Sequence, residues 1–372
     1  MSTKRVFVSD VHMSPGWSLD SKQGRYDWFN KDQAKQFAKF LQTMIDDATI
    51  NDVVILGDLM DSWVYPIETQ PPKYDKIANA PHITDVMANL KALAQKKKVI
   101  YVIGNHDMTL MEEQFSNFRT NAFANIAFKN FYETNDGLYA EHGHQYSMYN
   151  AVDPKHELPI GHYISRLYAT VAERKQHYYI SADFEARFPS TGKYNLDSKG
   201  LISDPMVNAP INLLEEELGN VDDSTSITTV NGGVITIAEV KKQYSRLGID
   251  WTEQHGLFGE ISSAWREGVG LDGVATQIAM GMVIDGQSFK IVIFGHTHKA
   301  LNNYLRRPDA AFSRDPKDAE PYAIYANCGA WCQDNDPTYV IDEYDDKTHE
   351  HIITLKYFGK AGKDIVTNIN ST

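Results

Sequence analysis

The sequence is poor in the features that mark membrane-spanning, secreted and polyanion-binding proteins. No run approaches the roughly 18 apolar residues that a spanning helix needs, and the opening MSTKRVFVSD lacks the long apolar core of a secretory signal. Acidic residues outnumber basic ones by 49 to 36, and the resulting net charge of −13 argues against general binding to nucleic acid or anionic membranes. We therefore expect a cytoplasmic protein with no membrane span.

Cysteine is equally scarce. The chain has 372 residues and only two cysteines, Cys328 and Cys332, both in the stretch NCGAWC. In a secreted protein these two could pair, whereas in an intracellular protein small, free, buried side chains are the more common use. We favour free cysteines, in a chain long enough for one large domain or two ordinary ones.

The first third of the chain alternates apolar strands with amphipathic helices. Strands are predicted at RVFVSD, DVVILGD and KKVIYVIGNHD, and helices at DQAKQFAKFLQTMIDD and HITDVMANLKALAQ. Such alternation predicts right-handed strand–helix–strand units and a largely parallel sheet. Sheets of this kind bind their ligands beyond the carboxyl ends of the strands.

The rest of the chain divides into a helical middle and a β-rich end. A hairpin turning at Asn135-Asp136-Gly137 precedes a helix over 160–176, and residues ~178–233 lose clear periodicity. Further helices are predicted at NLLEEELGN, ITIAEVKKQYSRL, GEISSAWREG and VATQIAMGMVID. The strand FKIVIFGHTH follows them, and then successive antiparallel strands are predicted at PYAIYANCG, PTYVIDEY and HIITLKYF. We predict a catalytic domain over 1–150 and 288–372, with an inserted cap over 151–287.

Polar residues recur where the predicted strands end. They form the patterns D-x-H, GD-x-x-D, GNHD, HGH and GHTH, namely Asp10 and His12, Asp58 and Asp61, Asn105 and His106, His142 and His144, and His296 and His298. One such pair is ordinary turn chemistry or a hydrogen-bonded surface residue. Five together indicate a metal centre.

The ligand types narrow the choice of metal. Carboxylate, imidazole and one amide oxygen, with no thiolate in these patterns, suit Mn²⁺, Fe, Zn²⁺ or Co²⁺, whereas calcium would require more oxygen. About seven ligands exceed what one ion needs once water is added. Two ions that share a bridging carboxylate fit better, and two-metal sites, with ions roughly 3.5–4 Å apart, support in-line phosphoryl displacement.

The five patterns, in this order, resemble those of the calcineurin-like metallophosphoesterases. The resemblance covers both ends of the chain and implies a four-layer αββα sandwich with a dinuclear site on one edge, with Mn or Fe favoured. Asp58 would bridge the two ions. One ion would be held by Asp10, His12, Asp58 and His298, and the other by Asp58, Asn105, His142 and His296.

The resemblance also implies catalytic roles. His106 would protonate the leaving oxygen or steady the transition state, paired with Asp61 or, as an alternative, Asp107. The nucleophile would be a metal-bridging hydroxide. His144 would support the metal ligands from behind or line the substrate pocket. Tyr146, Trp17 and Trp63 would also line that pocket, although for either tryptophan packing in the interior is an equally common role.

Two stretches, ILGDLMDSW and EHGHQYSMYN, resemble those of the subgroup that includes the UDP-diacylglucosamine pyrophosphohydrolases. The chain departs from this subgroup at His106, because these enzymes commonly carry Arg at that position. We expect a phosphohydrolase acting on a phosphodiester or pyrophosphate bond of a small molecule, nucleotide-containing ones among them. A phosphomonoesterase, a nuclease and a metal-retaining scaffold are the alternatives. The insertion is rich in Tyr and Arg, for example Arg166 and Tyr168, and we expect it to roof the metal site; a core-packing cap without substrate contact is the other interpretation.

Overall fold

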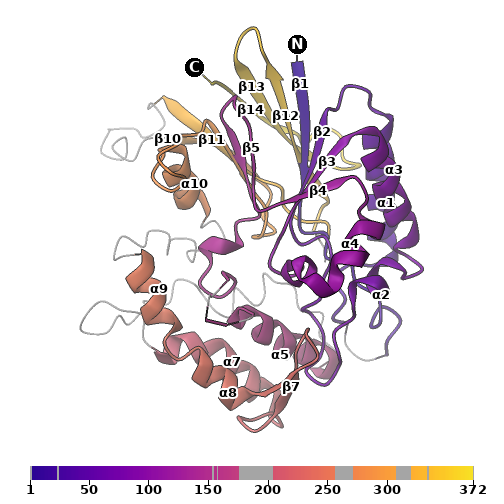
Figure 1. Cartoon of the computed structure of the whole chain (residues 1–372), viewed down its shortest axis with the longest axis vertical. Coiled ribbons are helices and arrows are strands. Elements are labelled where there is room, and N and C mark those ends of the chain that lie inside the picture. The colour runs from indigo at the N-terminus through magenta and orange to yellow at the C-terminus, as the bar shows by residue number, and fades with distance from the viewer. Residues whose placement is uncertain are drawn as a thin grey trace.

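The computed structural model describes residues 2–22, 25–152, 155–156, 158–175, 204–255, 271–306, 320–332 and 335–371. Two β-sheets face each other in the upper part of the molecule, with helices on both outer surfaces, and a group of helices lies below them (Figure 1). This arrangement confirms the predicted αββα sandwich with a largely helical insertion. Both ends of the chain lie at the top, away from the helical part.

The larger sheet has seven strands in the order β14-β13-β12-β1-β2-β3-β4. Strands β1 to β4 are parallel, as the alternating pattern predicts, and β12 joins β1 antiparallel. The bounds are β1 (Ser2–Val8), β2 (Asp52–Leu56), β3 (Lys98–Val102), β4 (Ile126–Lys129), β12 (Thr338–Asp345), β13 (Glu350–Tyr357) and β14 (Ile365–Asn370).

The smaller sheet has five strands in the order β10-β11-β9-β6-β5. Their bounds are β5 (Tyr132–Glu133), β6 (Leu138–Ala140), β9 (Ile291–Phe294), β10 (Leu301–Arg306) and β11 (Pro321–Asn327). The prediction of successive antiparallel strands at the end of the chain is partly wrong. β11 pairs parallel to β9 in this sheet, whereas β12 and β13 are antiparallel neighbours in the other.

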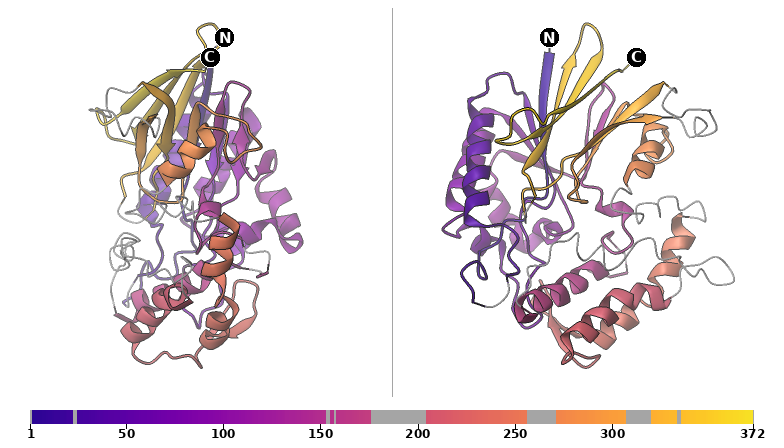
Figure 2. Two further views of the ribbon diagram at one scale, coloured as in Figure 1. Left: turned by 90° about the vertical axis from the view of Figure 1, so that its left-hand side faces the viewer. Right: turned by 180° about the vertical axis from the view of Figure 1, so that it is seen from behind.

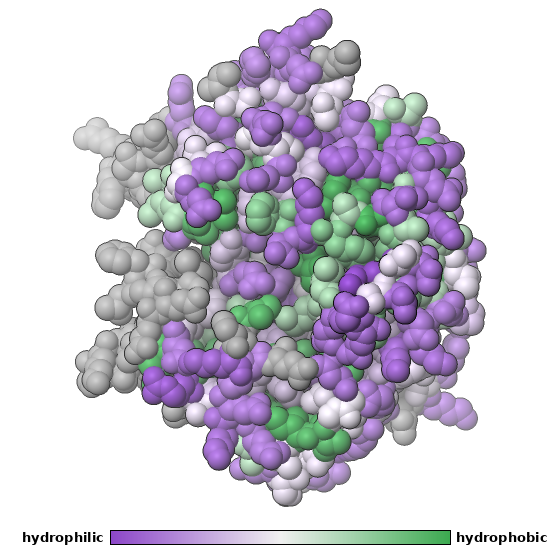
Figure 3. Space-filling view, in the orientation of Figure 1, coloured by the Kyte–Doolittle hydropathy of each residue, from purple (hydrophilic) through white to green (hydrophobic). Residues whose placement is uncertain are grey.

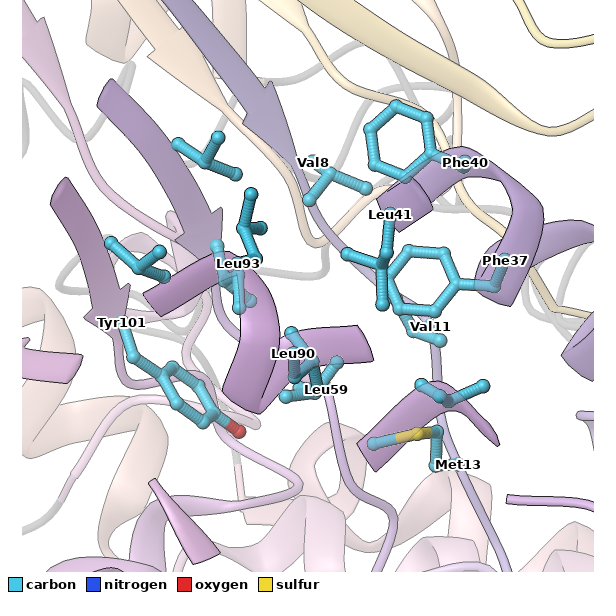
Figure 4. Packing of buried hydrophobic residues seen from close by; sticks show 14 of the residues in the cluster. Val8, Val11, Met13, Phe37, Phe40, Leu41, Leu59, Leu90, Leu93 and Tyr101 are labelled. Atoms are coloured by element: carbon cyan, nitrogen blue, oxygen red, sulfur yellow. The ribbon is translucent and has the colours of Figure 1, made fainter. Parts of the chain in front are cut away.

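Strand burial on both faces explains the continuous apolar runs. Val6 and Val8 of β1 pack toward the helical side, and Phe7 between them packs against the second sheet. On the helical side lie α1 (Lys31–Asp46) and α3 (Thr84–Lys96), whose Phe37, Leu41, Leu90 and Leu93 meet the strands (Figure 4). Alternate residues thus serve two cores, which fixes the register of the strands and the position of their tips.

The remaining helices are short within residues 1–150 and mostly longer in the predicted insertion. Residues 1–150 also contain α2 (Tyr74–Ala78), α4 (Ser116–Ala122) and the 3₁₀ turns Met108–Met111, Glu113–Phe115 and His144–Tyr146. The insertion has α5 (Ile160–Lys175), α7 (Asp204–Leu218), α8 (Ile237–Gln243), α9 (Leu247–His255) and a hairpin of β7 (Ser226–Thr228) and β8 (Val234–Thr236). These elements form the lower part of the molecule in both views of Figure 2.

Two elements of the middle region differ from their predicted positions. The acidic helix expected over 212–220 begins earlier, as α7, with Pro210 accommodated inside it although proline ordinarily interrupts a helix. α10 (Leu271–Ala279) belongs to the sequence range of the insertion but packs on β9 and β11, as the outer layer of the smaller sheet. The helix predicted at GEISSAWREG lies outside the described residues.

The surface agrees with the composition. The face in Figure 3 is mostly hydrophilic, and its hydrophobic residues form several separate patches. Among the described residues, no helix has the length and apolar character needed to cross a bilayer. Both cysteines are free and buried, as the sequence interpretation favours.

A buried ionic network joins the two sheets far from the strand tips. Arg5 of β1 donates to Asp342 (2.6 Å) and to Asp136, which lies in the predicted hairpin turn of the smaller sheet. His351 places one ring nitrogen 2.8 Å from Asp342 and the other 2.9 Å from the carbonyl oxygen of Asp136. Since both partners are acceptors, both nitrogens must donate, and His351 is cationic. Burial opposes that charge, but the bond to Asp342 outweighs burial and raises the pKa of His351.

We expect Asp342→Asn to lower the free energy of unfolding by about 3 kcal/mol, because it leaves buried cations without their shared carboxylate. In the wild type, the contribution of His351 should be fully present below the unfolded pKa of ~6.5 and be lost as pH rises through the raised folded pKa. Urea titrations at a series of pH values would measure both effects. Glu343→Gln, on the exposed face of the same strand, is the control and should cost under ~1 kcal/mol. An Asp342→Asn protein with the wild-type pH dependence would contradict the role of this network.

Candidate metal centre

The predicted ligands occupy strained backbone positions at the strand tips. Among the described residues, eight non-glycine residues have a positive φ, and five of them are Asp10, His12, Asp58, His296 and His298, with φ between 52° and 68°. Such conformations cost roughly 1–3 kcal/mol each and persist where the surrounding structure imposes them. Their concentration here indicates a functional site that is held in place by the two sheets.

Glycines in the motifs let these strand tips approach each other. A Cβ on Gly104 would lie 2.1 Å from Oδ1 of Asp58, and one on Gly295 would lie 2.4 Å from the Ser9 hydroxyl and 2.7 Å from Oδ2 of Asp10. Neither position has room for a side chain. The GN and GH patterns therefore include glycine because side chains from other strand tips, among them the carboxylates of Asp58 and Asp10, occupy the space.

One group of predicted ligands surrounds Asp10. Nε2 of His298 lies 3.3 Å from Oδ1 of Asp10 and 3.1 Å from Nε2 of His12. Nε2 of His12 is in turn 3.9 Å from the same Asp10 oxygen and 3.7 Å from Oδ2 of Asp58. Oδ1 of Asp10 is buried and has no hydrogen-bond partner. Three imidazole and carboxylate donors thus converge at spacings that ligands of one ion adopt.

The second group surrounds the other side of Asp58. Nε2 of His142 lies 3.2 Å from Oδ2 of Asp58 and 3.1 Å from Oδ1 of Asn105. Donor atoms of Asp58, His142 and His296 all lie within 4.8 Å of one another. The other Asp58 oxygen, Oδ1, accepts from the backbone N–H of His106 at 2.9 Å. Oδ2 of Asp58 is therefore oriented toward both groups, which is the placement that a bridging ligand requires.

Contacts behind the cluster fix the orientation of its histidines. Nδ1 of His142 donates to the carbonyl oxygen of Leu56 at 2.7 Å, and Nδ1 of His12 lies 3.3 Å from Oδ2 of Asp61. In each ring Nε2 therefore faces the cluster, where a metal ion would take the place of its proton. Carbonyl and carboxylate partners of this kind are the usual support of metal-binding histidines.

The charges in this buried cluster attract a cation. Burial opposes the charge of His12, but the neighbouring carboxylates of Asp10, Asp61 and Asp58 outweigh burial and raise the pKa of His12 to about 10. Burial likewise opposes the charge of His142, and Asp58 raises its pKa to about 9. Buried carboxylates that stabilise positively charged imidazoles in this way would also stabilise metal ions that replace the imidazole protons.

His106 stands beside the two groups and pairs with Asp61. Its Nδ1 lies 3.2 Å from Oδ1 of Asp61, an oxygen that also accepts from the backbone N–H groups of Trp63 and Val64 at 2.8 and 3.0 Å. The alternative partner, Asp107, instead accepts from Gly104 N, Leu59 N and the Tyr101 hydroxyl. Asp61 is therefore the carboxylate that contacts the His106 ring, whereas Asp107 connects the tips of two strands through its hydrogen bonds.

Two tryptophans enclose His106. The Trp63 ring stacks on His106 with 4.7 Å between centroids, and Trp28 lies 5.0 Å from His12, 5.8 Å from His106 and 5.9 Å from His298. The sequence interpretation includes Trp63 but misses Trp28. No periodic or motif signal marks Trp28, which belongs to the loop between β1 and α1.

The first helix of the insertion reaches these tryptophans. His162 of α5 meets Trp63 at 5.6 Å, and Tyr168 meets Trp28 at 6.4 Å. Arg166 of the same helix is fully buried and donates to the carbonyl oxygen of Pro66 at 2.7 Å, so it ties α5 to the loop that follows Asp61. α5 thus lies against the residues that enclose His106, the position that the predicted roof would occupy. Of the weakly periodic stretch over ~178–233, residues 178–203 lie outside the described residues, and the remainder contains α7 and β7.

The other predicted pocket residues lie at varying distances from the cluster. His144 is buried with its ring 5.4 Å from His142. Tyr146 packs on Phe294, and its hydroxyl bonds to Glu141, which is buried. Trp17 is about half exposed, and its ring contacts Tyr65 rather than the histidines. The structure therefore does not bring Trp17 to the cluster, contrary to the prediction.

Comparison with known proteins places this geometry in a family. Residues 3–185 match the family model described as calcineurin-like phosphoesterase. No curated protein gives a match. The chain shares with a nuclease MPE from Pseudomonas putida 16% identity and a TM-score of 0.24, over 37% of this chain and about half (53%) of the nuclease.

Two longer alignments extend over most of the chain. GAP50, titled the anchor in the inner membrane complex of Plasmodium, aligns over 99% of this chain and 89% of its own, at 8% identity and a TM-score of 0.38. A metallophosphoesterase from Sphaerobacter thermophilus aligns over 91% and 82%, at 12% identity and a TM-score of 0.28. On this match, residues 3–185, which contain four of the five motifs, belong to the calcineurin-like phosphoesterase family.

Proposed function

We propose that this chain is a metal-dependent phosphohydrolase that cleaves a phosphodiester or pyrophosphate bond in a small-molecule substrate. The observation that carries the proposal is the position of Oδ2 of Asp58, 3.7 Å from His12 and 3.2 Å from His142, between two groups of donors. That position suits two ions with a shared carboxylate, and the His106–Asp61 pair stands beside it.

The donor set fits the metals that the family implies. Asp10, His12, Asp58 and His298 would hold one ion, and Asp58, Asn105, His142 and His296 the other, with Mn, Fe, Zn or Co as candidates. The unpartnered, buried Oδ1 of Asp10 supports this fit, because a buried carboxylate oxygen without a partner is costly. When bound, two such ions would supply Lewis acidity that activates water near neutral pH and neutralises charge on the phosphoryl oxygens.

The protein's own groups would handle the proton of the leaving oxygen. His106 has its Nδ1 on Asp61, which leaves Nε2 as the nitrogen that can deliver a proton to substrate. Trp63 stacked on the ring and Trp28 beside it restrict the ring's rotation and keep water away from it. We assign His106 as the general acid and Asp61 as the group that orients it.

Asp61 has a second contact, and this predicts a double effect of its replacement. Asp61→Asn should lower turnover and also weaken metal binding ~10–100-fold, because Oδ2 supports His12 while Oδ1 supports His106. An amide cannot accept at both positions at once. Metal titration and kinetics on the same preparation would measure the two effects. Turnover lost with unchanged metal affinity would show that the contact to His12 is unimportant.

Metal analysis and a substrate screen test the proposed function. We expect two transition-metal ions per chain by elemental analysis, and hydrolysis of diester or pyrophosphate substrates, nucleotide-containing ones among them, in preference to monoesters. Hydrolysis of monoesters alone would replace the proposal with a phosphomonoesterase. Metal without hydrolysis of any phosphoester would favour a metal-retaining scaffold, and one ion per chain would overturn the dinuclear arrangement.

A further inference from the structure

We propose that Cys332 is a ligand of the ion held by His12 and His298, and that this half of the site therefore takes a thiophilic cation such as Zn²⁺ or Co²⁺. The proposal rests on the proposed function only in requiring a metal at this site. It goes beyond the ligand set of the five motifs, which contains imidazole, carboxylate and amide groups and no sulfur.

The first observation is the distance between the donors. Sγ of Cys332 lies 3.9 Å from Nδ1 of His298, and one donor atom each from His12, His298 and Cys332 lie within 4.8 Å of one another. A nitrogen and a sulfur bound to one zinc ion are at most about 4.4 Å apart, the sum of typical bond lengths. The nitrogen of His298 that faces His12 and Asp10 is Nε2, so binding of all three donors to one ion requires the Cys332 side chain to rotate from Nδ1 toward the Nε2 side of the ring.

The second observation is independent of the cysteine. Oδ1 of Asp10 is buried and unpartnered, and it faces the same two histidines at 3.3 and 3.9 Å. With Cys332 and the shared Asp58, the group offers two imidazole nitrogens, two carboxylate oxygens and one sulfur. Imidazole and sulfur donors among these five favour zinc or cobalt, whereas manganese and magnesium prefer oxygen.

The local fold holds Cys332 in this position. The backbone N–H of Trp331 donates to the carbonyl oxygen of Asp10 at 3.0 Å, which fixes the NCGAWC segment against the tip of β1. Cys332 packs in the same apolar cluster as Trp28, on the side of the insertion. Cys328, four residues earlier, packs instead between the two sheets. The two cysteines thus offer one test residue and one matched control.

Binding of the thiol is a simple exchange. The sulfur donates an electron pair to the ion, and the thiol proton passes to solvent. The competing interpretation is that the thiol only contacts Nδ1 of His298 and orients its ring, with no bond to the ion. The two interpretations differ in spectroscopy and in metal preference.

The test compares cobalt-loaded wild type, Cys332→Ser and Cys328→Ser. We expect a sulfur-to-cobalt charge-transfer band in the wild type and in Cys328→Ser, and its loss in Cys332→Ser. Chelator competition should show Zn²⁺ affinity reduced at least ~10-fold in Cys332→Ser, with a smaller change for Mn²⁺. Circular dichroism would check the fold of each variant, and the ¹¹³Cd chemical shift of the wild type reports a sulfur ligand without any substitution.

Absence of the charge-transfer band from the wild type, or its persistence in Cys332→Ser, would overturn the proposal. Equal losses of Zn²⁺ and Mn²⁺ affinity with no band would assign Cys332 to orienting His298, which also overturns it. These results are distinguishable from failure of the proposed function. The band does not depend on hydrolysis of any substrate, and hydrolysis without the band would leave the proposed function standing.

Discussion

Asp58→Asn should nearly abolish phosphoester hydrolysis and empty both metal positions. Oδ2 of Asp58 faces His12 and His142 across the two donor groups, and Oδ1 is held by the backbone N–H of His106. An asparagine could keep one of these contacts but would place a neutral amide where two cations share a negative charge. We expect a loss in kcat of ~10³-fold or more, equivalent to ~4 kcal/mol of transition-state stabilisation.

Replacement of a ligand from one group is the natural comparison. His12→Ala should weaken chiefly the ion near Asp10, because the contacts of His12 are with Asp10, Asp61 and His298, together with the shared Asp58. Elemental analysis of both variants, alongside kinetics, separates the two cases. An Asp58→Asn protein with two ions and wild-type turnover would show that Asp58 is not the bridge.

The convergence of the candidate ligands could be foreseen to a large extent, because it follows from strand order. Parallel strands of one sheet end on the same edge, so Asp10, Asp58 and Asn105 had to lie close together once β1, β2 and β3 were recognised. His142 and His296 follow β6 and β9, which are parallel neighbours in the facing sheet. Short-range patterns therefore carried the information on which residues converge.

The parts that escaped prediction depend on contacts between distant segments. Trp28 reaches the histidines because its loop is closed by Ser18 and Asp27, whose hydroxyl and carboxylate bond at 2.6 Å. Cys332 reaches His298 because β11 pairs with β9 and Trp331 bonds to the tip of β1. Neither arrangement leaves a periodic signal in the sequence.

The pairing of the last strands illustrates the same limit. Alternation marks PYAIYANCG and PTYVIDEY as strands, but it does not say which sheet each one joins. β11 and β12 are consecutive among these strands and lie in different sheets. The sequence likewise does not say where α10 packs. Its apolar face could have packed on the insertion, but it packs on the smaller sheet.

His106→Asn should lower kcat by ~10²–10⁴-fold while the metal content stays intact. The side chain of His106 contacts Asp61, Trp63 and His12, and it belongs to neither donor group around Asp58. Its backbone N–H, which orients Oδ1 of Asp58, is retained in the variant. The loss should therefore come from proton delivery and leave the metal ligands in place.

The leaving group decides whether that role is acid catalysis. A diester that releases p-nitrophenolate needs little protonation, so His106→Asn should lose much less activity toward it than toward an alkyl diester with a basic leaving oxygen. Both substrates meet the same metals and the same Asp58, so each serves as the control for the other. Equal losses for good and poor leaving groups would exclude proton donation and assign His106 to electrostatic stabilisation of the transition state instead. In that case the contact between Asp61 and His106 would serve to hold the imidazole beside the metal centre, and substrate preference would have to be sought in the residues around Trp28 and α5.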